Sequence, residues 1–316
     1  MAAGGASGDA ESVEAPFSGV VLVTRGDETL LAEASGYAHR AHRIENTVDT
    51  RFAIASGTKG FTALVVIGLI AEGRLELSTR ARDFLGEDLP LIDDRVTVEH
   101  LLTHTSGIGD YCDDDNPPEH PPWLVTSADY LAALGGFPQR FPPGERFHYN
   151  NGAFVVLGLI AERIAGIPFA DLVRTRVTEP AGMTDTEFLR SDALPARTAT
   201  GYLEDGRTNV FGLPVVGHGD GGIYSTAPDF RKFWAALFDG RIVPRRWVER
   251  LQRGERYGLG FWLPRPGVVR LAGGDHGVSF RSTHEPSSGV TATLISNDHR
   301  GGGPLLRWLD EFLTKA

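Results

Sequence analysis

The chain has 316 residues, a formal net charge of −10 and a sequence isoelectric point near 5.5. Apolar residues make up 41% of it, enough for a sizeable core, and no basic cluster favours nucleic acid or an anionic membrane surface as a partner. The longest apolar run, 63–71, is too short to cross a bilayer. A single cysteine, Cys112, excludes an internal disulfide and favours a cytoplasmic location.

The first third of the chain begins with a segment that carries no structural pattern. Residues 1–15 are small, polar and acidic, and they lack the basic start and apolar stretch of a signal peptide, so we expect a disordered tail. Residues 17–24 and 29–37 are rich in β-branched and aliphatic side chains on either side of a turn at Gly26. This pattern predicts a β-hairpin.

The middle of the chain is dominated by helical periodicity. The expected helices cover 60–72, 98–103, 128–134, 152–165, 169–178 and 230–238. Loops rich in proline and glycine join them. One of these loops, 109–122, contains two Pro-Pro pairs and is predicted to border a cleft or to act as a lid.

The end of the chain returns to strand patterns. Residues 257–263, 277–284 and 290–296 are predicted strands, and 305–314 is an amphipathic helix. Strands near both termini with helices between them predict an α+β fold (an α/β sandwich), with an antiparallel sheet of about five strands built from both chain ends and flanked by helices.

The same pattern predicts how the chain is divided. We expect a single catalytic domain over 16–314, whose sheet-containing part covers 16–82 and 207–314. A mostly helical insertion is expected over 83–206.

The tetrad Ser56-Gly57-Thr58-Lys59 opens the first predicted helix. A serine and a lysine three residues apart share one helix face, so the amine can take the hydroxyl proton. The start of a helix also collects backbone N–H groups that suit a developing oxyanion. Taken singly, Ser56 could be an N-cap and Lys59 a solvated lysine. The strand-like 51–55 before them and the strong helix after them favour an acyl-transfer site with Ser56 as nucleophile and Lys59 as base.

Two later residues are candidates for the same chemistry. Tyr149 has a phenol that can pass a proton to a leaving group, although it could instead be an aromatic anchor. Asn151 can present its amide to a substrate carbonyl, or it could cap the helix that begins at Gly152.

Three other patterns resemble a dinucleotide site, a metal site and a cysteine nucleophile, and each is rejected. Residues 217–222 match G-x-G-x-x-G, but no βαβ unit surrounds them, so a dinucleotide site is not expected. His100 and His104 have the helical i, i+4 spacing of metal ligands without a third ligand. The acidic run 113–115 disfavours a thiolate at Cys112. We therefore expect no cofactor, no metal and no cysteine nucleophile.

From about residue 17 to residue 313 the chain resembles the serine β-lactamase-like family, which includes class C β-lactamases, D-alanyl-D-alanine carboxypeptidases and related esterases. The tetrad at Ser56 looks like the first motif of that family, and Tyr149-Asn150-Asn151 looks like its Tyr-x-Asn motif. Segments similar to supporting parts of the family are 100–107, 141–144, 179–183 and 221–226.

The resemblance implies a β-lactamase/transpeptidase-like fold and an acyl-enzyme at Ser56, with an oxyanion held by the N–H of Ser56 and one at Gly277. The family carries Lys-Thr-Gly or His-x-Gly on the strand facing the serine. Registering 277–282 on that strand puts Gly274, without a side chain, at the position of the cation. His276, two residues on, is a candidate substitute. We therefore expect weak or no turnover of penicillins.

These observations predict a serine hydrolase that forms an acyl-enzyme with a small ester or amide substrate. An acyltransferase using the same acyl-enzyme, and a catalytically impaired small-molecule binding protein with this fold, remain as alternatives. Neither nucleic acid nor a membrane is expected as a partner.

Overall fold

The computed structural model of the protein describes residues 17–112, 123–298 and 302–315. The predicted tail, 1–15, and most of the predicted lid loop, 113–122, lie outside the described residues.

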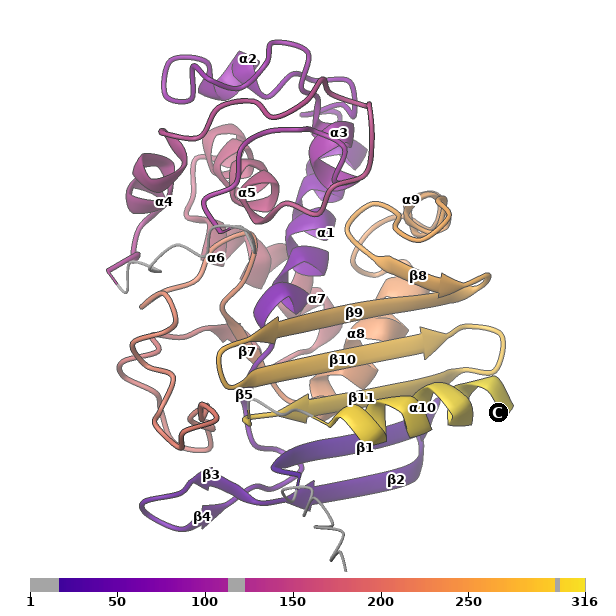
Figure 1. Ribbon diagram of the computed structural model, residues 1–316. Helices are drawn as coiled ribbons and strands as arrows, with labels where there is room; N and C mark the ends of the chain where they lie inside the picture. Colours follow the sequence, from indigo (N-terminus) through magenta and orange to yellow (C-terminus); the bar gives the residue numbers. More distant parts are fainter. Residues whose placement is uncertain (1–16, 113–122, 299–301, 316) are drawn as a thin grey trace, which may run out of the picture.

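A six-stranded antiparallel sheet organises the molecule, in the order β2-β1-β11-β10-β9-β8 (Figure 1). Its strands are β1 Gly19–Arg25, β2 Glu28–Ser35, β8 Trp262–Arg265, β9 Val268–Asp275, β10 Val278–Glu285 and β11 Val290–Ser296. The first strand pairs with the last, with Gly19 opposite Ser296, so both chain ends build one sheet. The predicted hairpin and the predicted fold class are confirmed.

The sheet has one strand more than the five expected, because the sequence analysis missed β9. This strand carries Gly273 and Gly274 next to one another. Glycine is depleted in strands, since it pays more backbone entropy and offers no side chain for packing. The pairing of β9 with β10 and β8 supplies the stabilisation that its own sequence lacks.

Helices cover both faces of this sheet. They are α1 Thr58–Ala71, α2 Arg82–Leu85, α3 Val98–Leu102, α4 Ser127–Leu134, α5 Asn151–Ala165, α6 Phe169–Val173, α7 Glu179–Ala181, α8 Ala227–Phe238, α9 Arg245–Leu251 and α10 Gly303–Lys315. One 3₁₀ turn, η1 Ala55–Gly57, precedes α1, and the π-helical segment η2 Arg174–Thr178 follows α6. Short strands complete the chain: β3 Tyr37–His39, β4 Ile44–Glu45, β5 Phe52–Ala53, β6 Glu187–Phe188 and β7 Ile223–Ser225.

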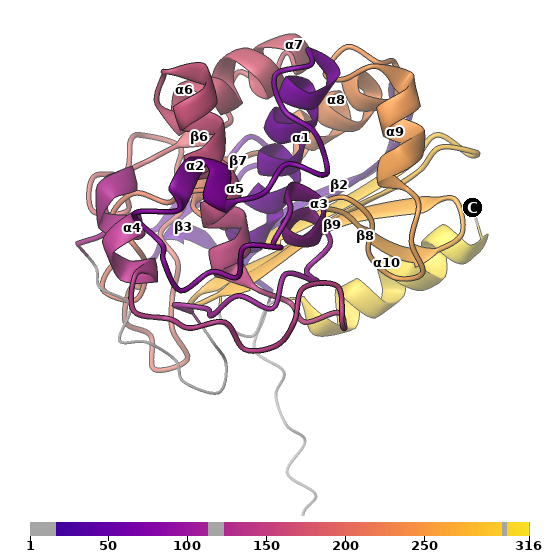
Figure 2. The same ribbon diagram turned by 90° about the horizontal axis from the view of Figure 1, so that it is seen from above.

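The two faces of the sheet have separate hydrophobic cores. Figures 1 and 2 show α10 on one face and α8, with the other helices, on the opposite face. Leu309 and Leu313 of α10 pack in the smaller core with alternate residues of β11, such as Ala292 and Leu294. Ile295, the next residue after Leu294, faces the other way and belongs to the larger core. This alternation is the period of two expected of a sheet covered on both sides.

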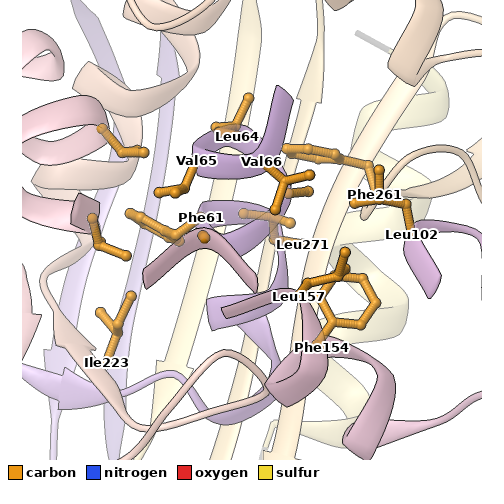
Figure 3. Close-up of a cluster of buried hydrophobic side chains, with 14 of the residues drawn as sticks. Phe61, Leu64, Val65, Val66, Leu102, Phe154, Leu157, Ile223, Phe261 and Leu271 are labelled. Atoms are coloured by element: carbon orange, nitrogen blue, oxygen red, sulfur yellow. The ribbon is translucent and has the colours of Figure 1, made fainter. Parts of the chain in front are cut away.

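The larger core is built around α1 (Figure 3). Phe61, Val65 and Val66 of this helix are 0% exposed, and Phe154 from α5 and Leu271 from β9 lie in the same cluster. A helix buried on nearly all sides is held by packing rather than by its own propensity. Each such apolar side chain contributes about 1.5–3 kcal/mol of burial free energy. The start of α1 is therefore a rigid place for reactive groups.

Candidate active site

Ser56 lies in η1, immediately before α1, where the chain turns sharply. Ala55, the preceding residue, has a φ of 44°, a left-handed conformation that costs a non-glycine residue about 1–3 kcal/mol. The end of β9 lies against this turn (Figure 1). A Cβ atom at Gly273 of β9 would clash with the Ile54 carbonyl oxygen and would lie 2.8 Å from the Ser56 backbone N. Glycine at this position lets the strand backbone approach the serine.

Lys59 is buried directly beneath Ser56, with 2% of its surface exposed. Its Nζ lies 3.1 Å from Ser56 Oγ, 2.8 Å from Asn151 Oδ1 and 2.8 Å from the Asp220 carbonyl oxygen. Three acceptors match the three positions around a primary amine nitrogen. The predicted proximity of Ser56 and Lys59 is thus present in the structure, at a distance that permits direct proton transfer.

The amide of Asn151 has a defined orientation. Its Nδ2 donates to the Cys112 carbonyl oxygen at 2.9 Å, which turns Oδ1 toward Lys59. The helix cap is the neighbouring residue, because Asn150 Oδ1 accepts from the Ala153 N–H at 2.6 Å. The structure therefore assigns the cap to Asn150, and the Asn151 amide contacts Lys59 and the Cys112 carbonyl.

Asp110 holds the backbone of Asn151 in place, and the sequence analysis missed it. The buried carboxylate accepts from the backbone N–H groups of Asn151 at 2.7 Å, Gly152 at 2.9 Å and Cys112 at 3.2 Å. Burial raises the pKa of Asp110, and these hydrogen bonds oppose that shift. An aspartate two residues before a cysteine carries no motif signal, so only the fold reveals it.

The glycine-rich segment 217–222 supplies a carbonyl to Lys59. A Cβ atom at Gly219 would clash with the Phe154 carbonyl oxygen, so only glycine lets the segment lie against α5. The Gly219 carbonyl accepts from Thr62 Oγ1 at 2.6 Å, and the next carbonyl, of Asp220, accepts from Lys59. Glycine in this segment thus permits close packing on α5, and the segment's carbonyls accept hydrogen bonds from α1.

Tyr149 lies beside the lysine in an aromatic stack. Lys59 Nζ is 5.0 Å from the centre of the Tyr149 ring, and Trp262 stacks on that ring at 6.0 Å with an interplanar angle of 11°. The centre of the His104 ring lies 4.3 Å from the centre of the Tyr149 ring. His104 Nδ1 accepts a hydrogen bond from the Asn150 N–H at 3.1 Å. Burial lowers the pKa of His104 well below the usual histidine value, so its imidazole is neutral.

The other histidine of the rejected metal pair also has a structural contact. His100 Nδ1 accepts from the Thr97 N–H at 3.2 Å at the start of α3. Within 17–112, 123–298 and 302–315, no three His, Cys, Asp or Glu side chains gather in a way that could hold a metal ion.

In the same ranges no single helix is long and apolar enough to span a membrane. One pair of helical segments has the length and composition of a span when the two are taken together, but the pair is bent by 84°. The two segments are Asn151–Ala165 and Phe169–Ala181.

A cleft of about 780 Å³ opens over these residues. Ser56, Tyr149 and Asn151, all half-buried, line it, so the structure brings these three candidates to one cavity. The remaining walls come from distant segments and include Asp110, Tyr111, Cys112, Tyr130, His148, Ser191, Asp220, Tyr224, Gly274, Asp275 and His276. A concave site with convergent polar groups is the usual setting of a small-molecule site.

Cys112 faces this cleft as a neutral thiol. Burial raises the pKa of Cys112 to about 12, and the carboxylates of Asp220, Asp110 and Asp275 act in the same direction. A thiol with so high a pKa is a poor nucleophile at neutral pH. The structure agrees with the prediction that Cys112 is not the nucleophile, with burial as the first cause.

The predicted placement of Gly277 is wrong. Gly277 lies in the turn between β9 and β10, where a Cβ atom would press on the backbone of Gly201 and Tyr202. The predicted strand 277–284 is β10, whereas the strand against Ser56 is β9, at Gly273. Because the sequence analysis missed β9, it took the neighbouring strand β10 as the strand that faces Ser56. Exposed His276 lines the cleft from the same turn, and its carbonyl accepts from Asn209 Nδ2 at 2.8 Å.

This fold and cleft define a protein of the penicillin-binding and β-lactamase-like class. The chain belongs to the Beta-lactamase family, whose model matches residues 10–305. The resemblance drawn from the sequence is confirmed. The family is one of hydrolases, and the relatives of this chain include proteins named as an esterase and an amidase.

Three relatives illustrate the range. A penicillin-binding protein from Bacillus halodurans has a solved structure that is 36% identical, with a TM-score of 0.87 over 94% of this chain and 96% of that one. The D-amino acid amidase of Ochrobactrum anthropi SV3 is 26% identical, with a TM-score of 0.81 over 95% and 96%. Esterase EstB of Burkholderia gladioli is 34% identical over 58% of this chain and 49% of its own length.

Proposed function

We propose that this protein is a serine hydrolase that forms an acyl-enzyme at Ser56 with a small ester or amide substrate. The observation that carries the proposal is the contact of Lys59 Nζ with Ser56 Oγ at 3.1 Å, beside a cleft of about 780 Å³. Relatives named as an esterase and a D-amino acid amidase support the substrate class.

Lys59 acts as the general base in this proposal. In the neutral amine, the carbonyl oxygens of Asn151 and Asp220 accept its two N–H bonds, which leaves the lone pair for the hydroxyl of Ser56. As Ser56 Oγ bonds to the substrate carbonyl carbon, its proton passes to Lys59 Nζ and the carbonyl electron pair moves to oxygen.

The negative oxygen needs backbone donors. We assign one donor to the backbone N–H of Ser56. The other is a backbone N–H of β9 between Gly273 and Asp275, in place of Gly277, because β9 is the strand that packs on η1. Loss of one such donor typically costs about 3 kcal/mol of transition-state stabilisation.

Tyr149 completes the cycle as the acid for the leaving group. Its phenol gives a proton to the departing nitrogen or oxygen, the carbon–heteroatom bond breaks, and the Lys59 ammonium returns a proton to the phenol. Water then attacks the acyl-enzyme and releases the acid and Ser56. Turnover of penicillins is expected to be weak or absent, because no lysine or arginine is among the described residues that line the cleft to receive their carboxylate.

A labelling experiment tests the proposal. A fluorophosphonate probe should add its mass to the intact protein at Ser56 and abolish hydrolysis of p-nitrophenyl butyrate. The Ser56→Ala variant should take no label and lose several orders of magnitude in kcat/KM. Ser191→Ala is the matched control, because Ser191 lines the same cleft but donates its hydroxyl to the Pro214 carbonyl. Labelling and hydrolysis that survive in Ser56→Ala would contradict the proposal.

A further inference from the structure

Helix α3 ends with a histidine at a position where glycine is the usual residue. His104 has a φ of 56° just beyond the helix. Its N–H donates to the Leu101 carbonyl at 3.3 Å, and the N–H of Thr105 donates to the His100 carbonyl at 2.9 Å. These are the two bonds of a Schellman motif. The left-handed conformation that this motif requires is unfavourable for a residue with a Cβ atom, so glycine would suit the backbone better.

The side chain of His104 is unfavourably placed as well. It is 0% exposed, and its Nδ1 accepts from the Asn150 N–H at 3.1 Å. Because Nδ1 is the acceptor, the proton of the neutral ring lies on Nε2, which has no hydrogen-bonding partner among the residues that the structure describes. A buried donor without a partner destabilises a fold. Two unfavourable features at one residue indicate that the imidazole does something that glycine could not do.

His104 holds the backbone on both sides of Tyr149. Its carbonyl oxygen accepts from the His148 N–H at 2.8 Å, and its Nδ1 accepts from the Asn150 N–H. A glycine could make only the first of these bonds, since the second needs the side chain. The amides of both neighbours of Tyr149 are therefore bound to one residue, which fixes the direction in which the phenol leaves the backbone.

The imidazole also packs on the phenol ring. The centres of the His104 and Tyr149 rings are 4.3 Å apart, with an interplanar angle of 34°. The other neighbours of the imidazole are aromatic too, namely Phe147, Phe154 and Tyr257. Burial in this cluster lowers the pKa of His104, with smaller contributions from the charges of Lys59 and His148. The imidazole therefore stays neutral at pH 7, and Nδ1 remains an acceptor.

The residues that hold Lys59 are fixed by other means. Asn151, which accepts from Lys59, has its own N–H bound to the Asp110 carboxylate, and so does Gly152. The contact of His104 ends at the N–H of Asn150. Loss of the imidazole should therefore move Tyr149 more than it moves the amide beside Lys59.

We propose that His104 is a positioning residue for Tyr149, whose phenol it holds where a proton can pass to the leaving group. The inference rests on the proposed function, in which Tyr149 is that acid. It predicts a loss that depends on the leaving group, because an anion that is stable in water departs without a proton and a more basic one does not.

Two esters of one acid measure this dependence. Phenyl butyrate lacks only the nitro group of p-nitrophenyl butyrate, so its leaving group is more basic. The readout is kcat/KM for the nitrophenyl ester divided by kcat/KM for the phenyl ester. In His104→Gly this ratio should rise at least about tenfold, a part of the 10²–10⁴-fold that a general acid supplies. In His104→Asn it should stay within about threefold of wild type, because asparagine tolerates a positive φ and its Oδ1 can replace Nδ1 as acceptor.

A double variant tests whether the effect passes through Tyr149. Tyr149→Phe should raise the ratio by itself, and adding His104→Gly to it should change the ratio less than about twofold, since coupled residues are not additive. His100→Ala is the matched control. It also removes an imidazole whose Nδ1 accepts a backbone N–H, that of Thr97, but His100 has no contact with Tyr149 among those found in the described residues, so the ratio should not change.

The protonation of the imidazole can be measured without an active variant. In the ¹⁵N spectrum of histidine-labelled wild-type protein at pH 7, the His104 signals, identified by their loss in His104→Asn, should show an unprotonated Nδ1 and a protonated Nε2. A protonated Nδ1 would overturn the inference even if His104→Gly does not fold.

The outcomes separate the two proposals. Wild-type protein that takes the fluorophosphonate at Ser56, together with a ratio that is unchanged in His104→Gly or equally raised in His104→Asn, would overturn the role of His104 and leave the hydrolase proposal standing. A full additional rise in the Tyr149→Phe background would also overturn it. Wild-type protein that takes no label and hydrolyses neither ester would overturn both.

Discussion

The chemistry of single residues centres on Lys59. A buried amine is costly unless its hydrogen-bonding positions are filled, and Ser56, Asn151 and Asp220 fill them. Two of these partners are 92 and 161 residues away along the chain. The lysine is thus positioned by α5 and by the 217–222 segment as much as by its own helix.

Replacing Lys59 by Met should separate its chemistry from its packing. Methionine nearly preserves the buried volume but removes the base, so kcat/KM for p-nitrophenyl butyrate should fall about 10²–10⁴-fold. Stability should fall by about 1–3 kcal/mol in urea unfolding, because two buried carbonyl oxygens lose their donor. Lys232→Met is the control: Lys232 pairs with Asp229 on α8, away from the cleft, so activity should persist. Full activity of Lys59→Met would refute the assignment of the base.

At the scale of elements, the site is the junction of η1 with β9. Two glycines let the start of α1 pack closely against the sheet. A Cβ atom at Gly57 would clash with the Phe280 ring of β10, and one at Gly273 would clash with the Ile54 carbonyl oxygen. A side chain at either position would push the strand away from the serine. The spacing between nucleophile and strand is therefore set by missing Cβ atoms.

Neighbouring glycines of β9 provide a matched pair of variants. Gly273→Ala should lower kcat/KM by at least about 100-fold, the size of losing one oxyanion donor, because its Cβ would force β9 away from Ser56. Gly274→Ala adds the same methyl group with no atom within 4 Å of it, so the activity should stay within a few-fold of wild type. Steady-state kinetics on both variants, with circular dichroism to establish folding, make the comparison. Equal losses in the two variants would exclude the proposed role of this junction.

At the scale of the whole molecule, the sheet joins both chain ends and the helical part supplies Tyr149 and Asn151 to the cleft. Residues near position 56, at 110–112 and 148–151, and between 217 and 276 line this one cleft. The domain boundaries and the cytoplasmic location drawn from the sequence stay predictions.

Buried histidines should make global stability depend on pH. Burial lowers the pKa of His218 to about 3 and of His284 to about 4, and that of His104 well below its usual value. Between the unfolded histidine pKa of about 6.5 and these values, the unfolded chain binds more protons than the folded one. The free energy of unfolding should therefore fall as the pH falls from about 6.5 to about 4, by up to about 1.4 kcal/mol per pH unit for each histidine.

Urea unfolding across this range measures that slope. His284 stacks on Trp234 and its Nδ1 bonds with Thr291 Oγ1 at 2.9 Å, away from the cleft. The His284→Gln variant should therefore show a slope smaller by up to about 1.4 kcal/mol per pH unit than wild type. A slope that does not change in this variant would show that His284 does not contribute.

Much of the fold could be predicted because its signals are local. The helices expected over 98–103, 128–134 and 152–165 match α3, α4 and α5 to within one residue at each end, since apolar periodicity and caps are short-range properties. β9 was missed because its stability comes from its neighbours, and that omission misplaced Gly277. No sequence motif indicated the roles of Asp110 and of the Asp220 carbonyl. Asp110 binds backbone N–H groups and Asp220 contributes its backbone carbonyl, and such contacts require no particular residue types in their partners.

The sequence by itself determined the reactive pair, because Ser56 and Lys59 are one helical turn apart and any helix beginning there brings them together. It also determined the family and the α+β architecture, through motifs and periodicities that act over a few residues. Only the tertiary structure decided which carbonyls hold the amine of Lys59, which strand faces Ser56, and that three aspartates share one cleft. Those relations join residues 55 or more positions apart, and the packing of the whole chain fixes such distances where no local pattern can.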